Sequence, residues 1–150
     1  MKKIITIAIC AFAVIAFAHT HTNTKLTHET KIVAATILAE ARGEGCGGMY
    51  AVAAVIAQRA FERKRTPKEI CLQPYQFSCW NGKKLKDLEH LLKVPQADYA
   101  LALARNIKLL SRDYIGFANH YHATWMKKKP YWAKGKKPVK VIGQHAFYKL

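Results

Sequence analysis

The 150-residue sequence predicts a single mainly α-helical domain, α+β only through a minor strand element. Apolar residues recur at helical spacing from Glu29 to just after Glu40, before the helix breaker Gly43. A glycine-rich stretch, residues 45–48, predicts a flexible connection. The following segment, Met49 to Arg63, is Ala-rich and apolar nearly all round, which is typical of a buried helix. These two adjacent segments predict the helical core.

Further along the chain, local signals predict shorter elements. Thr66 to Glu69 has the pattern of a capping box with proline at the first helical position, so it opens a short helix. Residues 74–83 are expected to form a loop and residues 85–92 a short helix. Pro95 begins a longer helix that ends near Asp113. One short strand is expected at 139–142, where β-branched residues cluster.

The net charge of +16 excludes an ordinary neutral metabolic enzyme as the default interpretation, because such a surface attracts polyanions. From Tyr114 onward the sequence has eight Lys and no Asp or Glu. Trp125, Tyr131 and Trp132 are interleaved with these lysines. The pattern suits single-stranded nucleic acid, and it equally suits anionic wall polymers or lipopolysaccharide.

The amino-terminal sequence favours cell-envelope polymers over nucleic acid as the partner of this basic protein. Residues 1–18 combine a basic start, an apolar stretch and a small-x-small cleavage site, which predicts a signal peptide. Residues 19–28 are a polar linker, and residues 29–150 form the expected catalytic domain. We therefore expect a secreted or periplasmic monomer that meets anionic cell-envelope polymers and no nucleic acid. Contact with the membrane is expected only through the export segment, whether this is cleaved or retained.

Three of the four cysteines remain once the export segment is removed, so they cannot all pair with one another. Cys71 and Cys79 are eight residues apart and are candidates for a disulfide that closes a small loop. Cys46 then remains as a free thiol. If the export segment is retained, Cys10 is also available for pairing.

Glu40 is the candidate catalytic group. A carboxyl at the end of a largely apolar helix is partly desolvated, and desolvation raises its pKa toward the range of a general acid. The alternative interpretation is a solvated ion pair with Arg42 in the last helical turn.

A series of motifs between residues 31 and 148 resembles the spore-cortex-lytic (SleB-like) cell-wall hydrolase family. The matching residues are Ala39 to Glu44, Gly48, Ala51 to Val55, Gln58-Arg59, Ile70-Cys71, Gln76-Phe77-Ser78, His120-Tyr121-His122, Pro130-Tyr131-Trp132 and Ile142 to Tyr148. Two positions depart from the family pattern. Gly45-Cys46-Gly47 replaces proline and polar residues, and Gln58 stands where asparagine is usual.

The resemblance implies a lysozyme-like domain related to lytic transglycosylases, which cleaves the glycan strands of peptidoglycan without a cofactor or metal. It makes Glu40 the catalytic acid and gives Glu44 a supporting or substrate-contacting role. The substrate-binding candidates are Glu44, Gln76, Phe77, Ser78, Tyr121, Trp132 and His145. Of these, Tyr121 and Trp132 are expected to stack on sugar rings.

Two other functions stay open at this point. His120, His122 and His145 are the residue types of an open zinc site, which would make the protein a peptidoglycan amidase. A cationic envelope-binding protein without catalysis is the other alternative. For the glycan-cleaving enzyme itself, the product can come from attack by water, as in a muramidase, or by the sugar's own 6-hydroxyl, as in a lytic transglycosylase.

Overall fold

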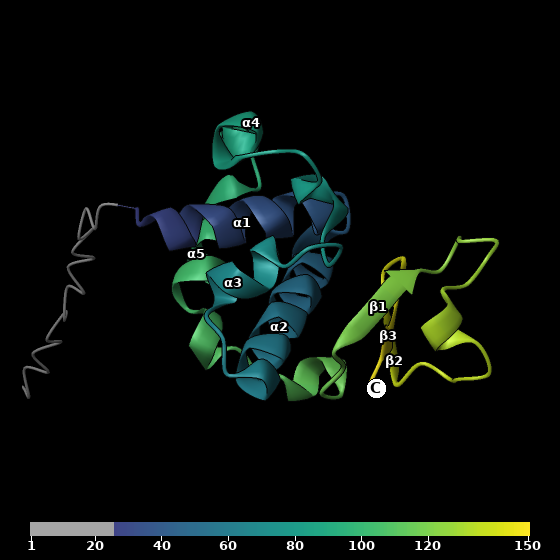
Figure 1. The fold of residues 1–150 in the computed structure, drawn as a ribbon. Helices are drawn as coiled ribbons and strands as arrows, with labels where there is room; N and C mark the ends of the chain where they lie inside the picture. Colours follow the sequence, from purple (N-terminus) through teal and green to yellow (C-terminus); the bar gives the residue numbers. More distant parts are fainter. Residues whose placement is uncertain (1–25) are drawn as a thin grey trace, which may run out of the picture.

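The computed structural model describes residues 26–150 (Figure 1). The expected signal peptide and most of the expected linker lie outside the described residues. A helical body forms one side of the molecule, and a small sheet with its connecting loop forms the other. None of the helices in the described part of the chain combines the length and apolar character needed to cross a membrane.

Helix α1 (His28–Ala41) is the centre of the helical body. The side chain of Thr27 caps it by accepting a hydrogen bond from the Thr30 amide. All residues from Ile32 to Leu38 are buried, because α1 packs against α2, α3 and α5. The burial of this helix on every side places its last turn, with Glu40, at the edge of the core.

Helix α2 (Gly45–Arg63) begins four residues earlier than predicted, so the expected flexible connection at 45–48 was wrong. These glycines form the first turn of the helix. Gly48 is buried, and a Cβ atom at this position would overlap the side chain of Glu44. The glycines therefore permit close packing at the start of α2.

The shorter helices follow the predicted order. Helix α3 (Pro67–Leu72) has the predicted capping box. Helix α4 (Leu85–Leu88) continues into a 3₁₀ turn at Glu89–Lys93. Helix α5 (Ala97–Arg105) ends well before Asp113. Other 3₁₀ turns cover Ser78–Trp80, Ile107–Leu109, Asp113–Ile115 and Tyr131–Ala133.

The early end of α5 has a local cause. The carbonyl of Ala102 accepts hydrogen bonds from both the backbone amide and the side-chain amide of Asn106, and such a local side-chain bond competes with continuation of the helix. A tighter 3₁₀ turn then replaces the last turns of the predicted helix.

The sheet has three antiparallel strands where one was predicted: β1 (His120–Ala123), β2 (Lys140–Ile142) and β3 (His145–Tyr148), in the order β1-β3-β2. In the register, Tyr121 lies opposite Phe147. Because side chains alternate along a strand, one face carries Tyr121, His145 and Phe147 toward the helices. The other face carries His120, His122, Ala146 and Tyr148, and Trp132 packs on it. The predicted mainly α-helical class with a minor strand element is confirmed.

Candidate active site

The carboxyl of Glu40 lies where the last turn of α1 meets the sheet. The side chain is half-buried, and its Oε2 accepts a hydrogen bond from the Tyr121 hydroxyl at 2.8 Å. Tyr121 comes from the middle of β1, 81 residues along the chain. This hydrogen bond joins the last turn of α1 to the sheet.

Burial determines the direction of the Glu40 pKa. Desolvation raises the pKa of this carboxyl above its ordinary value of 4.5, while the Tyr121 hydrogen bond and the positive charge of Arg59 lower it in part. Arg42 does not form the ion pair that was considered, because its guanidinium donates to the carbonyl of Leu38 in its own helix. The predicted rise in the pKa of Glu40 is therefore confirmed in direction.

This pKa shift predicts a pH-dependent change in stability for Glu40→Gln. A carboxyl whose folded-state pKa is raised stabilises the fold at low pH and loses that contribution as the pH rises from 4.5 through the raised pKa. A glutamine at this position is neutral at every pH and avoids the loss. We expect Glu40→Gln to unfold at a higher temperature than the parent at neutral and alkaline pH, with the difference disappearing in acid. Thermal unfolding followed by circular dichroism across this range measures it, and a constant difference at every pH contradicts it.

Arg59 is a candidate site residue to which the sequence analysis gave no role. It is 5% exposed, and its Nε donates to the backbone carbonyl of Asn119 at 2.7 Å. Its guanidinium lies over the ring of Phe77, 5.4 Å from the ring centre. Within the described residues its Nη1 has no hydrogen-bond partner. The available signal was the position of this cation, directly after a run of the helix that is apolar nearly all round.

Glu44 anchors the turn between β2 and β3. Its Oε2 accepts a hydrogen bond from the backbone amide of Gln144 at 2.7 Å. A Cβ atom at Gly143 would overlap this carboxylate oxygen, and one at Gly48 would overlap the Cβ of Glu44. The two glycines leave the space that the side chain occupies. Of the two roles expected for Glu44, supporting or substrate-contacting, this geometry favours the supporting one.

His145 lies on the helix-facing side of the sheet beside Tyr121, with the two rings edge to face at 5.0 Å between centres. It is 8% exposed, and its Nδ1 has no hydrogen-bond partner in residues 26–150. Burial lowers the pKa of His145, an effect that the nearby charge of Glu44 partly opposes. The ring is therefore uncharged at neutral pH and is close to the group that holds Glu40.

The other substrate-binding candidates form no hydrogen bond with Glu40 in residues 26–150. Phe77 is 2% exposed and belongs to the core under Arg59, so its ring is not accessible to a sugar. Gln76 is half-buried and accepts from Arg63, and Ser78 is exposed at the start of a 3₁₀ turn. Trp132 packs on the face of the sheet that points away from the helices. The predicted sugar-stacking role of Trp132 therefore has no geometric support at Glu40.

The three histidines considered for zinc do not converge. His120 and His122 lie on the outer face of the sheet, and His145 lies on the inner face. The Nε2 of His122 is also within hydrogen-bonding distance of the Tyr148 hydroxyl, at 3.1 Å. Within residues 26–150, no three side chains of the ligating types are close enough together to hold a metal ion. The geometry gives no support to the amidase alternative.

The cysteines expected to pair are separate thiols in the structure. Cys71 is buried, Cys79 is half-buried and Cys46 is exposed. Burial raises the pKa of both Cys71 and Cys79 to about 12, so both are protonated at neutral pH. The disulfide stays a prediction that mass spectrometry of the exported protein can test.

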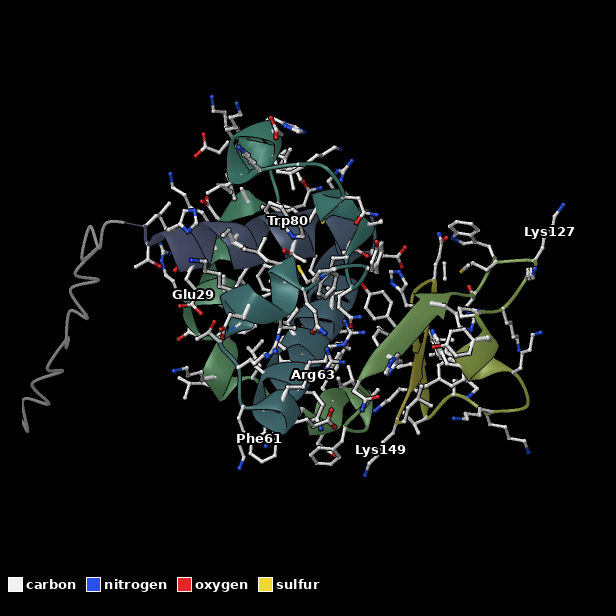
Figure 2. All side chains as sticks on the ribbon, in the orientation of Figure 1. Glu29, Phe61, Arg63, Trp80, Lys127 and Lys149 are labelled. Carbon is white, nitrogen blue, oxygen red and sulfur yellow. The ribbon has the colours of Figure 1, made fainter. Side chains whose placement is uncertain are left out.

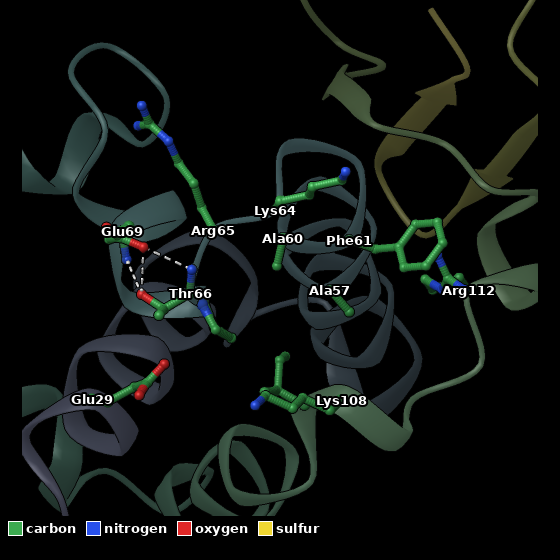
Figure 3. A pocket seen from close by; sticks show the side chains of 12 residues that line it. Glu29, Ala57, Ala60, Phe61, Lys64, Arg65, Thr66, Glu69, Lys108 and Arg112 are labelled. Atoms are coloured by element: carbon green, nitrogen blue, oxygen red, sulfur yellow. Dashed lines mark hydrogen bonds between the residues drawn. The ribbon is translucent and has the colours of Figure 1, made fainter.

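A surface pocket of about 500 Å³ lies at the opposite end of α1 from Glu40. Its lining includes Glu29, which is eleven residues and therefore about 16 Å before Glu40 along the helix. Figure 3 shows that Thr66 and Glu69, on its rim, are engaged with each other in the capping box of α3. This pocket is separate from the candidate active site.

The helical body and three-stranded sheet together form the fold of known SleB catalytic domains. The structure is similar to the catalytic domain of the germination-specific lytic transglycosylase SleB from Bacillus anthracis, with a TM-score of 0.62 and 22% identity. The match covers 85% of this chain and 98% of that one. The catalytic domain of the Bacillus cereus SleB protein gives the same TM-score and identity, over 81% of this chain and 89% of that one. At 22% identity this similarity shows the shared fold alone.

The family model for cell wall hydrolases matches residues 43–148, and the chain belongs to that family. No curated protein matches the sequence significantly. The family match begins three residues after Glu40, so the assignment of this residue depends on its geometry. The predicted family and the prediction that the protein is an enzyme acting on the cell wall are confirmed.

Proposed function

We propose that this cell wall hydrolase cleaves the glycan strand of peptidoglycan, at the bond between N-acetylmuramic acid and N-acetylglucosamine, with Glu40 as the general acid. The observation that carries the proposal is the half-buried Glu40 carboxyl, bonded to the Tyr121 hydroxyl and close to the charge of Arg59. A raised pKa keeps a fraction of this carboxyl protonated near neutral pH, as an acid catalyst requires.

In the proposed reaction, protonated Glu40 donates its proton to the glycosidic oxygen as the bond from that oxygen to the anomeric carbon breaks. The resulting carboxylate is stabilised by two groups already in place. The Tyr121 hydroxyl donates a hydrogen bond to it, and the Arg59 guanidinium supplies a positive charge nearby. Both interactions favour the charged form of Glu40, so they strengthen as the proton leaves.

The second half of the reaction requires a nucleophile at the anomeric carbon. Glycosidases that use two carboxylates need the second one about 5 to 9 Å from the first. In the described chain the hydrogen-bonding partner of Glu40 is a phenol, and the Glu44 carboxylate is held by the β2–β3 turn. This arrangement favours attack by the sugar's own 6-hydroxyl, which returns its proton to Glu40 and gives a 1,6-anhydro product.

The product test uses mass spectrometry of the fragments that residues 19–150 release from purified peptidoglycan. We expect 1,6-anhydro-muramyl ends, with release that depends on Glu40. Reducing sugar ends that also depend on Glu40 would make the enzyme a muramidase with the same acid. Free stem peptides would identify an amidase, and binding without release would identify a non-catalytic envelope protein. Either of these last two outcomes overturns the proposal.

Two further expectations belong to this proposal. Residues 1–18 are proposed to export the enzyme to the periplasm or the exterior, where a net charge of +16 favours anionic envelope polymers and glycan strands as partners of the monomer. Amino-terminal sequencing of the exported protein tests the export segment. A chain beginning at His19 supports cleavage, and one beginning at Met1 supports retention.

A further inference from the structure

A strongly cationic surface segment, residues 124–140, runs from the end of β1 to the first residue of β2 and is called here the cationic loop. It contains seven lysines, all exposed: Lys127, Lys128, Lys129, Lys134, Lys136, Lys137 and Lys140. The last acidic residue of the chain is Asp113. None of the seven lysines forms an ion pair with a side chain of residues 26–150. Apart from Lys140, whose Nζ lies over the Tyr114 ring at 5.9 Å from its centre, these charges are available to a partner.

The cationic loop also exposes apolar side chains. Trp125 is 71% exposed and Tyr131 is 86% exposed, and Met126 beside them is 38% exposed. By contrast, Trp132 holds the loop from inside by packing on His120, His122 and Tyr148. The loop conformation is thus stabilised without Trp125 or Tyr131, and these rings are left without an intramolecular role.

The position of the cationic loop separates it from the catalytic groups. Figure 1 shows it extending from the end of β1 on the side away from the helical body, and Figure 2 shows Lys127 at its outer end pointing into solvent. Thr124, where the loop starts, is three residues after Tyr121, which corresponds to about 10 Å of strand. A partner bound at the outer end of the loop therefore lies beyond the Glu40 site.

We propose that the cationic loop docks the enzyme on an anionic phospholipid surface, with its lysines at headgroup phosphates and Trp125, Met126 and Tyr131 in the interface. Indole and phenol rings prefer the headgroup region of a bilayer, where the apolar ring leaves water and the polar atom stays hydrated. Aromatic rings also stack on the sugars and bases of soluble polyanions, but Met126 beside them does not, and burying all three side chains together requires an apolar layer. The exposed rings beside the lysines therefore favour a lipid surface, a partner beyond the proposed function.

The expected effect of the lysines follows from the surface potential of anionic lipid. We expect Lys127→Gln/Lys128→Gln/Lys129→Gln to lower partitioning onto phosphatidylglycerol-containing vesicles by roughly 100-fold at low salt. The matched control removes the same charge from the helical body, where Lys83, Lys86 and Lys93 are exposed. We expect Lys83→Gln/Lys86→Gln/Lys93→Gln to keep most of the binding.

The experiment measures cosedimentation of the exported protein with vesicles of phosphatidylcholine, with and without phosphatidylglycerol, together with tryptophan emission. We expect binding only with phosphatidylglycerol and a blue shift that Trp125→Ala removes. Leu109, which is 83% exposed on the helical body, provides the apolar control, and Leu109→Ala should keep both binding and shift.

Four outcomes overturn the proposal. These are the absence of binding to anionic vesicles, equal losses in the two triple variants, binding that no loop variant weakens, and competition by soluble polyphosphate with unshifted Trp125 emission. Binding that no loop variant weakens would assign it to another part of the chain, and competition by polyphosphate would assign the cationic loop to a polymer. Lysis of purified peptidoglycan, which contains no lipid, is expected to be unchanged in Trp125→Ala and separates this inference from the proposed function.

Discussion

Glu40→Gln is expected to lower the rate of glycan-strand release by about 1,000-fold or more, because a positioned general acid commonly contributes two to four orders of magnitude. The amide has nearly the shape of the carboxyl, and its oxygen can still accept the hydrogen bond from Tyr121. What it cannot do is give a proton to the glycosidic oxygen. The loss should therefore appear in kcat with the fold intact.

The measurement is the initial rate of fragment release from purified peptidoglycan, with circular dichroism and wall cosedimentation on the same samples. Glu89→Gln is the matched control, because Glu89 is an exposed glutamate whose only ion pair, with Lys31, has a distance of 3.4 Å in the described chain. We expect Glu89→Gln to keep the parental rate. Unchanged release in Glu40→Gln would show that Glu40 is not the general acid. Loss of release in both variants would show that the effect is not specific to Glu40.

The helical part of this fold was predictable because its signals are local. The capping box at Thr66 to Glu69 and the apolar spacing of α1 each fix an element within a few residues of sequence. The end of α5 was not predictable in the same way, since apolar residues continue past Arg105 and the chain turns there through the Asn106 side chain. When the apolar pattern continues beyond the end of a helix, as it does here, its spacing predicts the helix correctly but places the end of the helix too late.

The sheet was harder to predict because its strands are short. Strands β1 and β3 are four residues each, and their histidines and aromatic residues give no clear alternation of polar and apolar positions. Their faces become evident only from the pairing of Tyr121 with Phe147. Trp132 was assigned to the substrate as an aromatic ring suited to stacking on sugars, and only the tertiary structure shows that it packs on the outer face of the sheet.

The candidate site was predictable at Glu40 and much less so around it. The position of Glu40 at the end of an apolar helix is a local feature, and it was sufficient to predict a desolvated carboxyl. Its partners Tyr121 and Arg59 come from β1 and from the later part of α2, so no spacing in the sequence connects them to it. A site assembled from three separate elements requires the tertiary fold.

Gly143→Ala is expected to lower the stability of the protein strongly, because Gly143 lies where Glu44 connects the start of α2 to the β2–β3 turn. Gly143 has a φ of +55°, in the left-handed region, and its missing Cβ leaves room for the Glu44 carboxylate. An alanine there would cost about 1 kcal/mol in backbone strain. It would also displace the carboxylate from the Gln144 amide, and loss of this charged hydrogen bond costs roughly 2 kcal/mol more. We expect a total near 3 kcal/mol, or about 6 to 12 °C in Tm.

Gly82 provides a control that separates backbone strain from the loss of the Glu44 hydrogen bond. It has a φ of +67° and nothing within 4 Å of where its Cβ would lie. Gly82→Ala should lose only about 1 kcal/mol. The hairpin turn also carries His145, two residues after Gly143 and in contact with Tyr121, so we expect Gly143→Ala to lower kcat by about 10- to 100-fold. In the double variant Glu44→Ala/Gly143→Ala the overlap is relieved, and its stability loss should be smaller than the sum of the two single losses. Equal losses in Gly82→Ala and Gly143→Ala, measured by thermal unfolding, would contradict a role for Glu44 in holding the turn against the active site.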